Sequence, residues 1–120
     1  MDKYEKIIQL YKHPINFGNV EGQTHFGSAS NRICGDNIKI ELKVEEGKIK
    51  KAGFTGVGCA LSIAGASLLT EKLKGMELDK AAKIDDDTML ALFGLGPDIK
   101  GNRKRCALLS LVALRKALGI

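Results

Sequence analysis

The stretch Asn37-Ile-Lys-Ile-Glu-Leu-Lys-Val44, followed by a Glu-Glu-Gly turn and by Lys48-Ile-Lys-Lys-Ala-Gly-Phe-Thr-Gly-Val57, decides the fold. Apolar and charged side chains alternate in its first half, so that one face is buried and the charged face, with Glu41, lies in solvent. The turn predicts that residues 48–57 return as the second strand of a hairpin. A third strand is expected within residues 20–33, around Thr24 to Ser28.

Helical patterns surround this hairpin. Before it, Tyr4 to Tyr11 predicts a helix with Asp2 as N-cap, ending at His13-Pro14 because proline disfavours helical angles in the residue before it. Residues 15–33 lack a firm periodicity and otherwise predict a long loop. Further helices are expected from Gly58-Cys59 to Lys74 with Gly75 as the C-terminal cap, from Leu78 to Ile84, from Asp85–Asp87 to Phe93 before a Gly94–Pro97 loop, and from Arg103 to Leu118.

Strands followed by several helices favour an α+β fold, with a small antiparallel sheet of about three strands and helices packed on one face. A length of 120 residues predicts a single domain over residues 1–120. The apolar content of 44% and charged content of 28% are typical of a folded globular protein rather than a disordered one. No apolar run approaches the roughly 18–20 residues of a membrane span, and no export signal is visible. Free thiols then favour a cytoplasmic location.

The net charge of +5 reflects a basic C-terminal region with no acidic residue after Asp98. Its basic residues are Lys100, Arg103, Lys104, Arg105, Arg115 and Lys116. A nucleic-acid binder can show such a cluster, but aromatic residues and nucleic-acid motifs are lacking here, which argues against that partner. A solvated basic face and docking onto an acidic protein remain as alternatives.

Three cysteines stand in three separate motifs, each where a predicted loop meets a strand or helix. The motifs are Asn31-Arg-Ile-Cys34-Gly-Asp36, Gly56-Val-Gly-Cys59-Ala-Leu-Ser62 and Arg103-Lys-Arg-Cys106-Ala-Leu-Leu109. An odd number of thiols counts against a disulfide framework. Three thiolates and the Asp36 carboxylate would complete a four-coordinate site for a soft metal or an iron–sulfur cluster. The alternative is that all three are small buried hydrophobic residues, but the neighbouring glycines and the Cys-Gly-Asp triplet favour a site.

At least two of the three sulfurs have a local reason to be reactive. Gly35 permits a tight turn that brings Asp36 back towards Cys34, and Gly58 allows close backbone approach. Cys59 lies at a predicted helix N-terminus, which favours thiolate. The basic residues 103–105 are expected to lower the pKa of Cys106.

The remaining candidate ligands have simpler explanations. His25 lies in a glycine-rich loop and His13 at a helix end, so neither is given a ligand role. Asp85-Asp86-Asp87 is better explained by helix capping than by a hard cation.

Taken together, Cys34-Gly35-Asp36, Phe54-x-Gly56-x-Gly58-Cys59 and Cys106-Ala-Leu-Leu resemble the U-type iron–sulfur cluster assembly scaffolds, IscU, SufU and the N-terminal domain of NifU. The resemblance covers nearly the whole chain. It implies that Cys34, Asp36, Cys59 and Cys106 bind a transient 2Fe–2S cluster, or zinc. It also implies a pyridoxal-phosphate cysteine desulfurase as sulfur donor, with Cys34 as the first candidate acceptor and Cys106 as the alternative. An iron donor and cluster acceptor proteins complete the implied partners.

Two departures from the family pattern matter. IscU proteins place a histidine before the third cysteine, within a Leu-Pro-Pro-Val-Lys segment read by a dedicated chaperone. Here Arg105 takes that position and residues 95–100 differ, which excludes a histidine ligand there and argues against the chaperone. Arg103-x-x-Cys106 instead resembles SufU, although the SufU insertion is missing. A non-enzymatic scaffold and sulfur acceptor is therefore favoured, and a zinc-dependent sulfurtransferase and a structural zinc module remain as alternatives.

Overall fold

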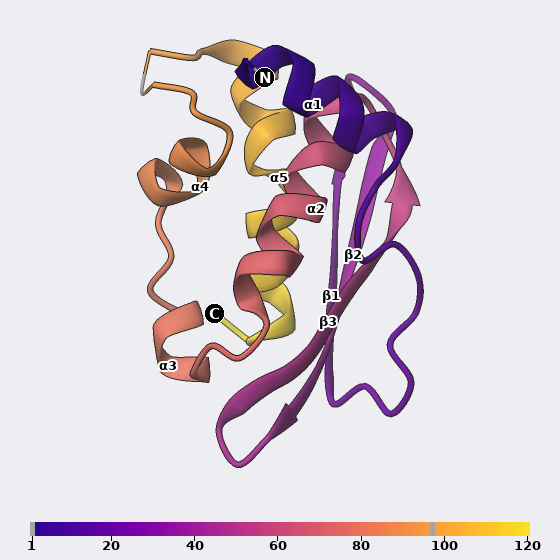
Figure 1. Ribbon diagram of the computed structural model, residues 1–120, viewed down its shortest axis with the longest axis vertical. Helices are drawn as coiled ribbons and strands as arrows, with labels where there is room; N and C mark the ends of the chain where they lie inside the picture. The colour runs from indigo at the N-terminus through magenta and orange to yellow at the C-terminus, as the bar shows by residue number, and fades with distance from the viewer. Residues whose placement is uncertain (1, 97) are drawn as a thin grey trace.

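The computed structural model describes residues 2–96 and 98–120, so Pro97 of the expected loop lies outside the described residues. An antiparallel sheet in the order β1-β2-β3 carries its helices on one face (Figure 1). This confirms the α+β class and the three-stranded sheet. The elements are α1 (Lys3–Lys12), β1 (His25–Asn31), β2 (Asp36–Glu45), β3 (Lys48–Val57), α2 (Ala60–Leu73), α3 (Leu78–Ala81), α4 (Asp86–Leu92) and α5 (Gly101–Ala117).

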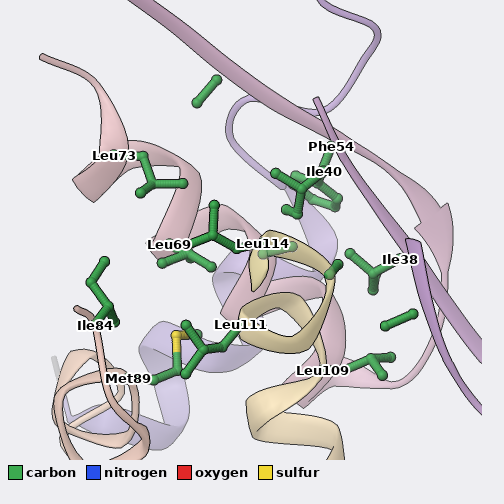
Figure 2. Packing of buried hydrophobic residues seen from close by; sticks show 14 of the residues in the cluster. Ile38, Ile40, Phe54, Leu69, Leu73, Ile84, Met89, Leu109, Leu111 and Leu114 are labelled. Atoms are coloured by element: carbon green, nitrogen blue, oxygen red, sulfur yellow. The ribbon is translucent and has the colours of Figure 1, made fainter. Parts of the chain in front are cut away.

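The inner face of the sheet forms the core with α2 and α5. Ile38, Ile40 and Leu42 alternate along β2 and are fully buried, as their spacing predicts. The antiparallel register places Ile40 opposite Phe54 of β3 on the same face. Figure 2 shows Ile38, Ile40 and Phe54 beside leucines of α2 and α5. Among the described residues, no helix has both the length and the apolar character to span a membrane.

β1 extends further than its sequence suggests. It runs to Asn31, three residues past the expected end at Ser28, and pairs with β2 so that Asn31 lies opposite Asp36. α5 packs directly on this strand, because a Cβ at Gly27 would lie 2.3 Å from the backbone nitrogen of Ala117. This contact places the start of β1 against the C-terminal end of α5.

The outer face of the sheet is partly covered, and the expectation that Glu41 faces solvent is wrong. Its side chain is only 2% exposed, and Oε1 accepts a hydrogen bond of 3.0 Å from the Val20 N–H. Nearby, Gly18 N–H donates to the Phe54 carbonyl at 2.8 Å, and Phe54 N–H donates to the Asn16 carbonyl at 3.0 Å. Part of the predicted 15–33 loop is therefore bound along the edge strand.

The helix boundaries lie at or near the predicted capping residues. Asp2 and Asp85 accept hydrogen bonds at the starts of α1 and α4, and Gly75 adopts φ +80° after α2, as predicted. α3 ends at Ala81 rather than Ile84, because the chain must become extended at Asp85 to cap α4. α5 begins at Gly101, two residues earlier than expected.

The small residues of α2 allow the close helix contact that their sequence indicates. A Cβ at Gly65 would lie 3.4 Å from the Ala107 carbonyl of α5 and 2.8 Å from the Phe93 ring. The two helices therefore pack with almost no side chain between their backbones at this point.

A buried hydroxyl in α5 offers a test of this packing. Ser110 is 1% exposed, and its Oγ has no hydrogen-bond partner within the described part of the chain. We expect Ser110→Ala to raise the free energy of unfolding by about 1 kcal/mol, because it removes an unsatisfied buried polar group. Urea denaturation followed by circular dichroism measures the change. The matched control is Ser67→Ala, which should lower stability because Ser67 Oγ accepts the Ile15 N–H at 3.2 Å. Equal losses in both variants would contradict the prediction.

Candidate metal centre

The four predicted ligands come from different elements and meet at one end of the sheet. Cys34 lies in the turn between β1 and β2, Asp36 begins β2, Cys59 is the N-cap of α2, and Cys106 lies in α5. One ligand atom from each of Cys34, Asp36 and Cys106 lies within 4.8 Å of the other two. The Cys59 Sγ lies 3.5 Å from Asp36 Oδ2. The starts of α2 and α5 and the β1–β2 turn share the upper end of the view in Figure 1.

The sulfur atoms differ in their access to solvent. Cys106 is buried, Cys59 is half-buried and Cys34 is exposed. The Cys106 Sγ lies 3.6 Å from the Cys34 Sγ and 3.2 Å from Asp36 Oδ2. The group is therefore closed on the α5 side and open on the side of the Cys34 turn.

The Asp36 carboxylate is the polar centre of the group. Its Oδ1 accepts the Cys59 N–H at 3.0 Å, and its Oδ2 accepts the Ser62 hydroxyl at 2.5 Å. A Cβ at Gly58 would lie 3.1 Å from the Asp36 Cγ, so glycine makes room for this carboxylate. Gly35, with φ +69°, turns the chain between Cys34 and Asp36. The predicted turn at Gly35 is confirmed, whereas Gly58 makes room for side chains rather than for a second stretch of backbone.

Hydrogen bonding decides the ionisation of Asp36. Burial raises the pKa of this carboxyl group, but hydrogen bonds from Ser62, Cys106 and Cys59 outweigh burial and hold the pKa below its usual value. The group is consequently a carboxylate at neutral pH, which is the form that binds metal.

The expectation that the basic segment lowers the pKa of Cys106 is wrong. Burial, followed by hydrogen bonding to Asp36 and to the two other cysteines, raises the pKa of the Cys106 thiol. The helix directs Cys106 inwards while Arg103 and Arg105 remain exposed. The thiol therefore faces a carboxylate rather than the guanidinium groups, and a positively charged metal would be needed to favour its thiolate.

Three further polar residues contact the group, and the sequence did not identify their roles. Ser62, three residues after Cys59 in α2, donates to Asp36. Asn31 and Asn102 donate to the sulfurs of Cys106 and Cys34, respectively. The spacing of Asn102 and Cys106, four residues apart in one helix, was the available signal, because such residues share a helix face.

The other residues considered as ligands serve local structure. His13 caps α1 through its backbone N–H, and His25 Nδ1 lies 2.8 Å from Thr24 Oγ1. Asp85 caps α4 by accepting the Thr88 N–H at 2.8 Å, as predicted. Of the basic residues, Arg115 forms an ion pair of 3.3 Å with Asp86, so it belongs to the α4–α5 contact rather than to a free basic face.

Comparison with known proteins gives a consistent picture. The model of the NifU-like N-terminal domain family matches residues 2–119. The iron–sulfur cluster assembly scaffold protein IscU 1 of Archaeoglobus fulgidus is 33% identical over 114 residues, spanning 95% of this chain and 72% of that protein. Escherichia coli IscU is 33% identical over 118 residues, spanning 95% and 89%. NifU of Azotobacter chroococcum is 39% identical over 98 residues, spanning 80% of this chain but only 32% of that protein.

Solved structures share the fold. A Fervidobacterium islandicum protein assigned as a scaffold of the SUF system, FiSufU, has a TM-score of 0.77 at 22% identity, with 95% of this chain and 94% of that chain covered. The N-terminal part of a NifU-like protein from Brucella abortus has a TM-score of 0.76 at 18% identity, with 96% and 90% covered. At these identities the likeness concerns the fold alone.

The low pKa of Asp36 predicts how stability depends on pH. Because the folded pKa lies below the unfolded value of about 4, ionised Asp36 stabilises the fold above that value. This contribution is lost as pH falls from about 5 downwards through the folded pKa. We expect Asp36→Asn to be less stable than wild type at pH 7 and to lose less stability on acidification. Urea denaturation of chelator-treated protein across this pH range measures both effects.

The control is Asp79→Asn, an exposed carboxylate in α3 that should leave the pH profile unchanged. An acid limb as steep in Asp36→Asn as in wild type would contradict the assignment of this pH dependence to Asp36.

Proposed function

Because the chain belongs to the NifU-like N-terminal domain family, we propose that it is an iron–sulfur cluster assembly scaffold. In this role it accepts sulfur from a cysteine desulfurase, binds iron and holds a 2Fe–2S cluster as cargo before passing it to an acceptor protein. The proposed ligands are Cys34, Cys59, Cys106 and Asp36. The scaffold is non-enzymatic, since the cluster is what it carries rather than a cofactor for turnover.

The observation that carries this proposal is the gathering of three thiols around one buried carboxylate. Sulfur ligands select iron–sulfur clusters and zinc over hard cations such as Mg²⁺. The Asp36 Oδ2 lies 3.2 Å from the Cys106 Sγ and 3.5 Å from the Cys59 Sγ, so two thiols contact the carboxylate directly. The relatives named as IscU scaffolds span 95% of the chain at about one-third identity, which supports the same role.

Exposure favours Cys34 as the sulfur acceptor. Its thiolate would attack the outer sulfur of the desulfurase persulfide, so that a new S–S bond forms at Cys34 while the desulfurase cysteine leaves as a thiolate. Cys34 lies at the surface, whereas Cys106 is buried and has a raised pKa. Both properties make Cys106 the less suitable acceptor.

Asp36 is the proposed ligand that would bind iron most weakly. A carboxylate is a harder ligand than a thiolate, so it should hold cluster iron less firmly. Ser62 and the Cys59 N–H already hydrogen-bond this carboxylate, which gives it an alternative partner when cargo leaves. The mixed set therefore suits a cluster that must be released.

A zinc-dependent sulfurtransferase is the second candidate. The same four residues would satisfy tetrahedral Zn²⁺, and the third cysteine motif resembles SufU. In this case Cys34 would relay sulfur while zinc remains bound. A purely structural zinc module is the third, in which the metal only stabilises the fold.

Metal and sulfide content separates these functions. Anaerobically purified protein incubated with a cysteine desulfurase, cysteine, a reductant and Fe²⁺ should gain equimolar iron and acid-labile sulfide, with a visible absorption spectrum. Cys34→Ser should lose this cluster and the persulfide while keeping the melting temperature of the metal-free protein, because Cys34 is exposed. Tightly bound zinc that persists and is needed to stimulate the desulfurase would favour the second candidate. Unaltered sulfur transfer in Cys34→Ser would favour the third.

Substitution of Asp36 tests its proposed role in cluster release. We expect Asp36→Ala to slow transfer of a reconstituted cluster to an apo-ferredoxin by roughly tenfold, because the weak ligand is lost and thiolates hold the iron. Absorption and circular dichroism spectroscopy follow the transfer. Asp79→Ala is the matched control, and a transfer rate in Asp36→Ala equal to that of the control would remove Asp36 from the release step.

A further inference from the structure

Two asparagines connect the Cys34 turn to α5. We propose that Asn31 and Asn102 form an amide bridge that positions the sulfurs of Cys34 and Cys106 and donates hydrogen bonds to them in the metal-bound state. This inference rests on the proposed function insofar as the sulfurs are metal ligands, and it assigns a role to two residues outside the ligand set.

The bridge is a continuous chain of hydrogen bonds. The Ile33 N–H donates to Asn31 Oδ1 at 3.2 Å. Asn31 Nδ2 donates to Asn102 Oδ1 at 2.8 Å and to the Cys106 Sγ at 3.5 Å. Asn102 Nδ2 then donates to the Cys34 Sγ. Each sulfur of the pair thus receives one amide donor.

The orientation of both amides follows from this chain. A backbone N–H can only donate, so the oxygen of Asn31 must face Ile33 and its NH₂ group must face Asn102. The oxygen of Asn102 must accept that donor, which leaves its NH₂ group facing Cys34. The donor polarity towards the sulfurs is therefore set by the fold.

Burial of Asn31 increases the importance of these hydrogen bonds for stability. Asn31 is only 7% exposed, and a buried amide is costly unless its donors are satisfied. Asn31 is the last residue of β1, and Asn102 lies in the first turn of α5. The bridge therefore joins two elements that the core already holds together, and Cys34 lies in the exposed turn that follows Asn31.

The donors divide the site into two sides. N–H donors withdraw electron density from a thiolate and weaken its bond to metal. Cys34 and Cys106 receive amide donors, whereas the Cys59 sulfur lies 3.5 Å from both the Asp36 carboxylate and the Ser62 hydroxyl. We infer that the bridge also holds the Cys34 turn against α5, so that its sulfur stays beside that of Cys106.

The experiment uses Co²⁺ alone as the probe, bound anaerobically to the full chain. Loss of a donor raises the energy of the sulfur electrons, so Asn102→Leu should move the sulfur-to-cobalt charge-transfer band to longer wavelength. Asn102→Asp should do the same, because it retains an oxygen for Asn31 while removing the donor to Cys34. Hydrogen exchange of the amides at 33–35 should be faster in Asn102→Leu.

Asn37→Leu is the matched control, since Asn37 is exposed beside Asp36 and should leave band and exchange unchanged. A band in both Asn102 variants at the wild-type wavelength, or exchange at the wild-type rate, would overturn the proposal, as would the absence of any such band in wild type. Failure of the proposed function looks different. In that case Co²⁺ bands shift as expected while no iron–sulfur cluster forms with desulfurase and iron.

Discussion

The site depends on the contacts that the Asp36 carboxylate makes with its neighbours. Asp36 begins β2, and it accepts hydrogen bonds from the backbone N–H of Cys59 and the hydroxyl of Ser62 at the start of α2. The Cys106 thiol of α5 lies against the same carboxylate. One buried charge thus connects the sheet to both core helices at the end where the cysteines meet. Gly58 leaves room there, because a Cβ at this position would lie only 3.1 Å from the Asp36 carboxyl carbon.

The register in which the strands pair determines the geometry of this site. Asn31 pairs with Asp36 and Asn37 pairs with Val57, so the ends of β1 and β3 lie on either side of the start of β2. A slip of one residue would reverse the faces of the strand and expose its buried isoleucines. The same apolar alternation that forms the core consequently fixes which residues can reach the carboxylate. Stability and ligand placement are therefore specified by one pattern.

Local chemistry allowed much of this arrangement to be predicted from sequence. The alternation of apolar and charged residues predicted the hairpin, and Asp2 and Asp85 marked the starts of two helices. The glycines beside the cysteines predicted close packing around the site. The failures involve contacts between distant segments. Glu41 follows the exposed half of the pattern, yet it is buried, and the Val20 N–H of the 15–33 segment donates a hydrogen bond to its carboxylate. The asparagines of the amide bridge are 71 residues apart, and neither shows its partner in its own neighbourhood. Charge near Cys106 in sequence likewise proved a poor guide, because a helix separates adjacent side chains onto different faces.

The three thiols occupy supports of different rigidity, and this difference bears on the proposed transfer of a cluster. Cys106 is buried within a helix, so its sulfur cannot move far without disturbing the core. Cys59 caps α2, where the backbone is held by Asp36. Cys34 alone stands in an exposed turn, tied to α5 through its sulfur by Asn102. A cargo held by two fixed sulfurs and one on a short turn has a defined side from which to leave. Under the proposed function, a sulfur donor and a cluster acceptor would both approach on that side, so entry and exit would share a face.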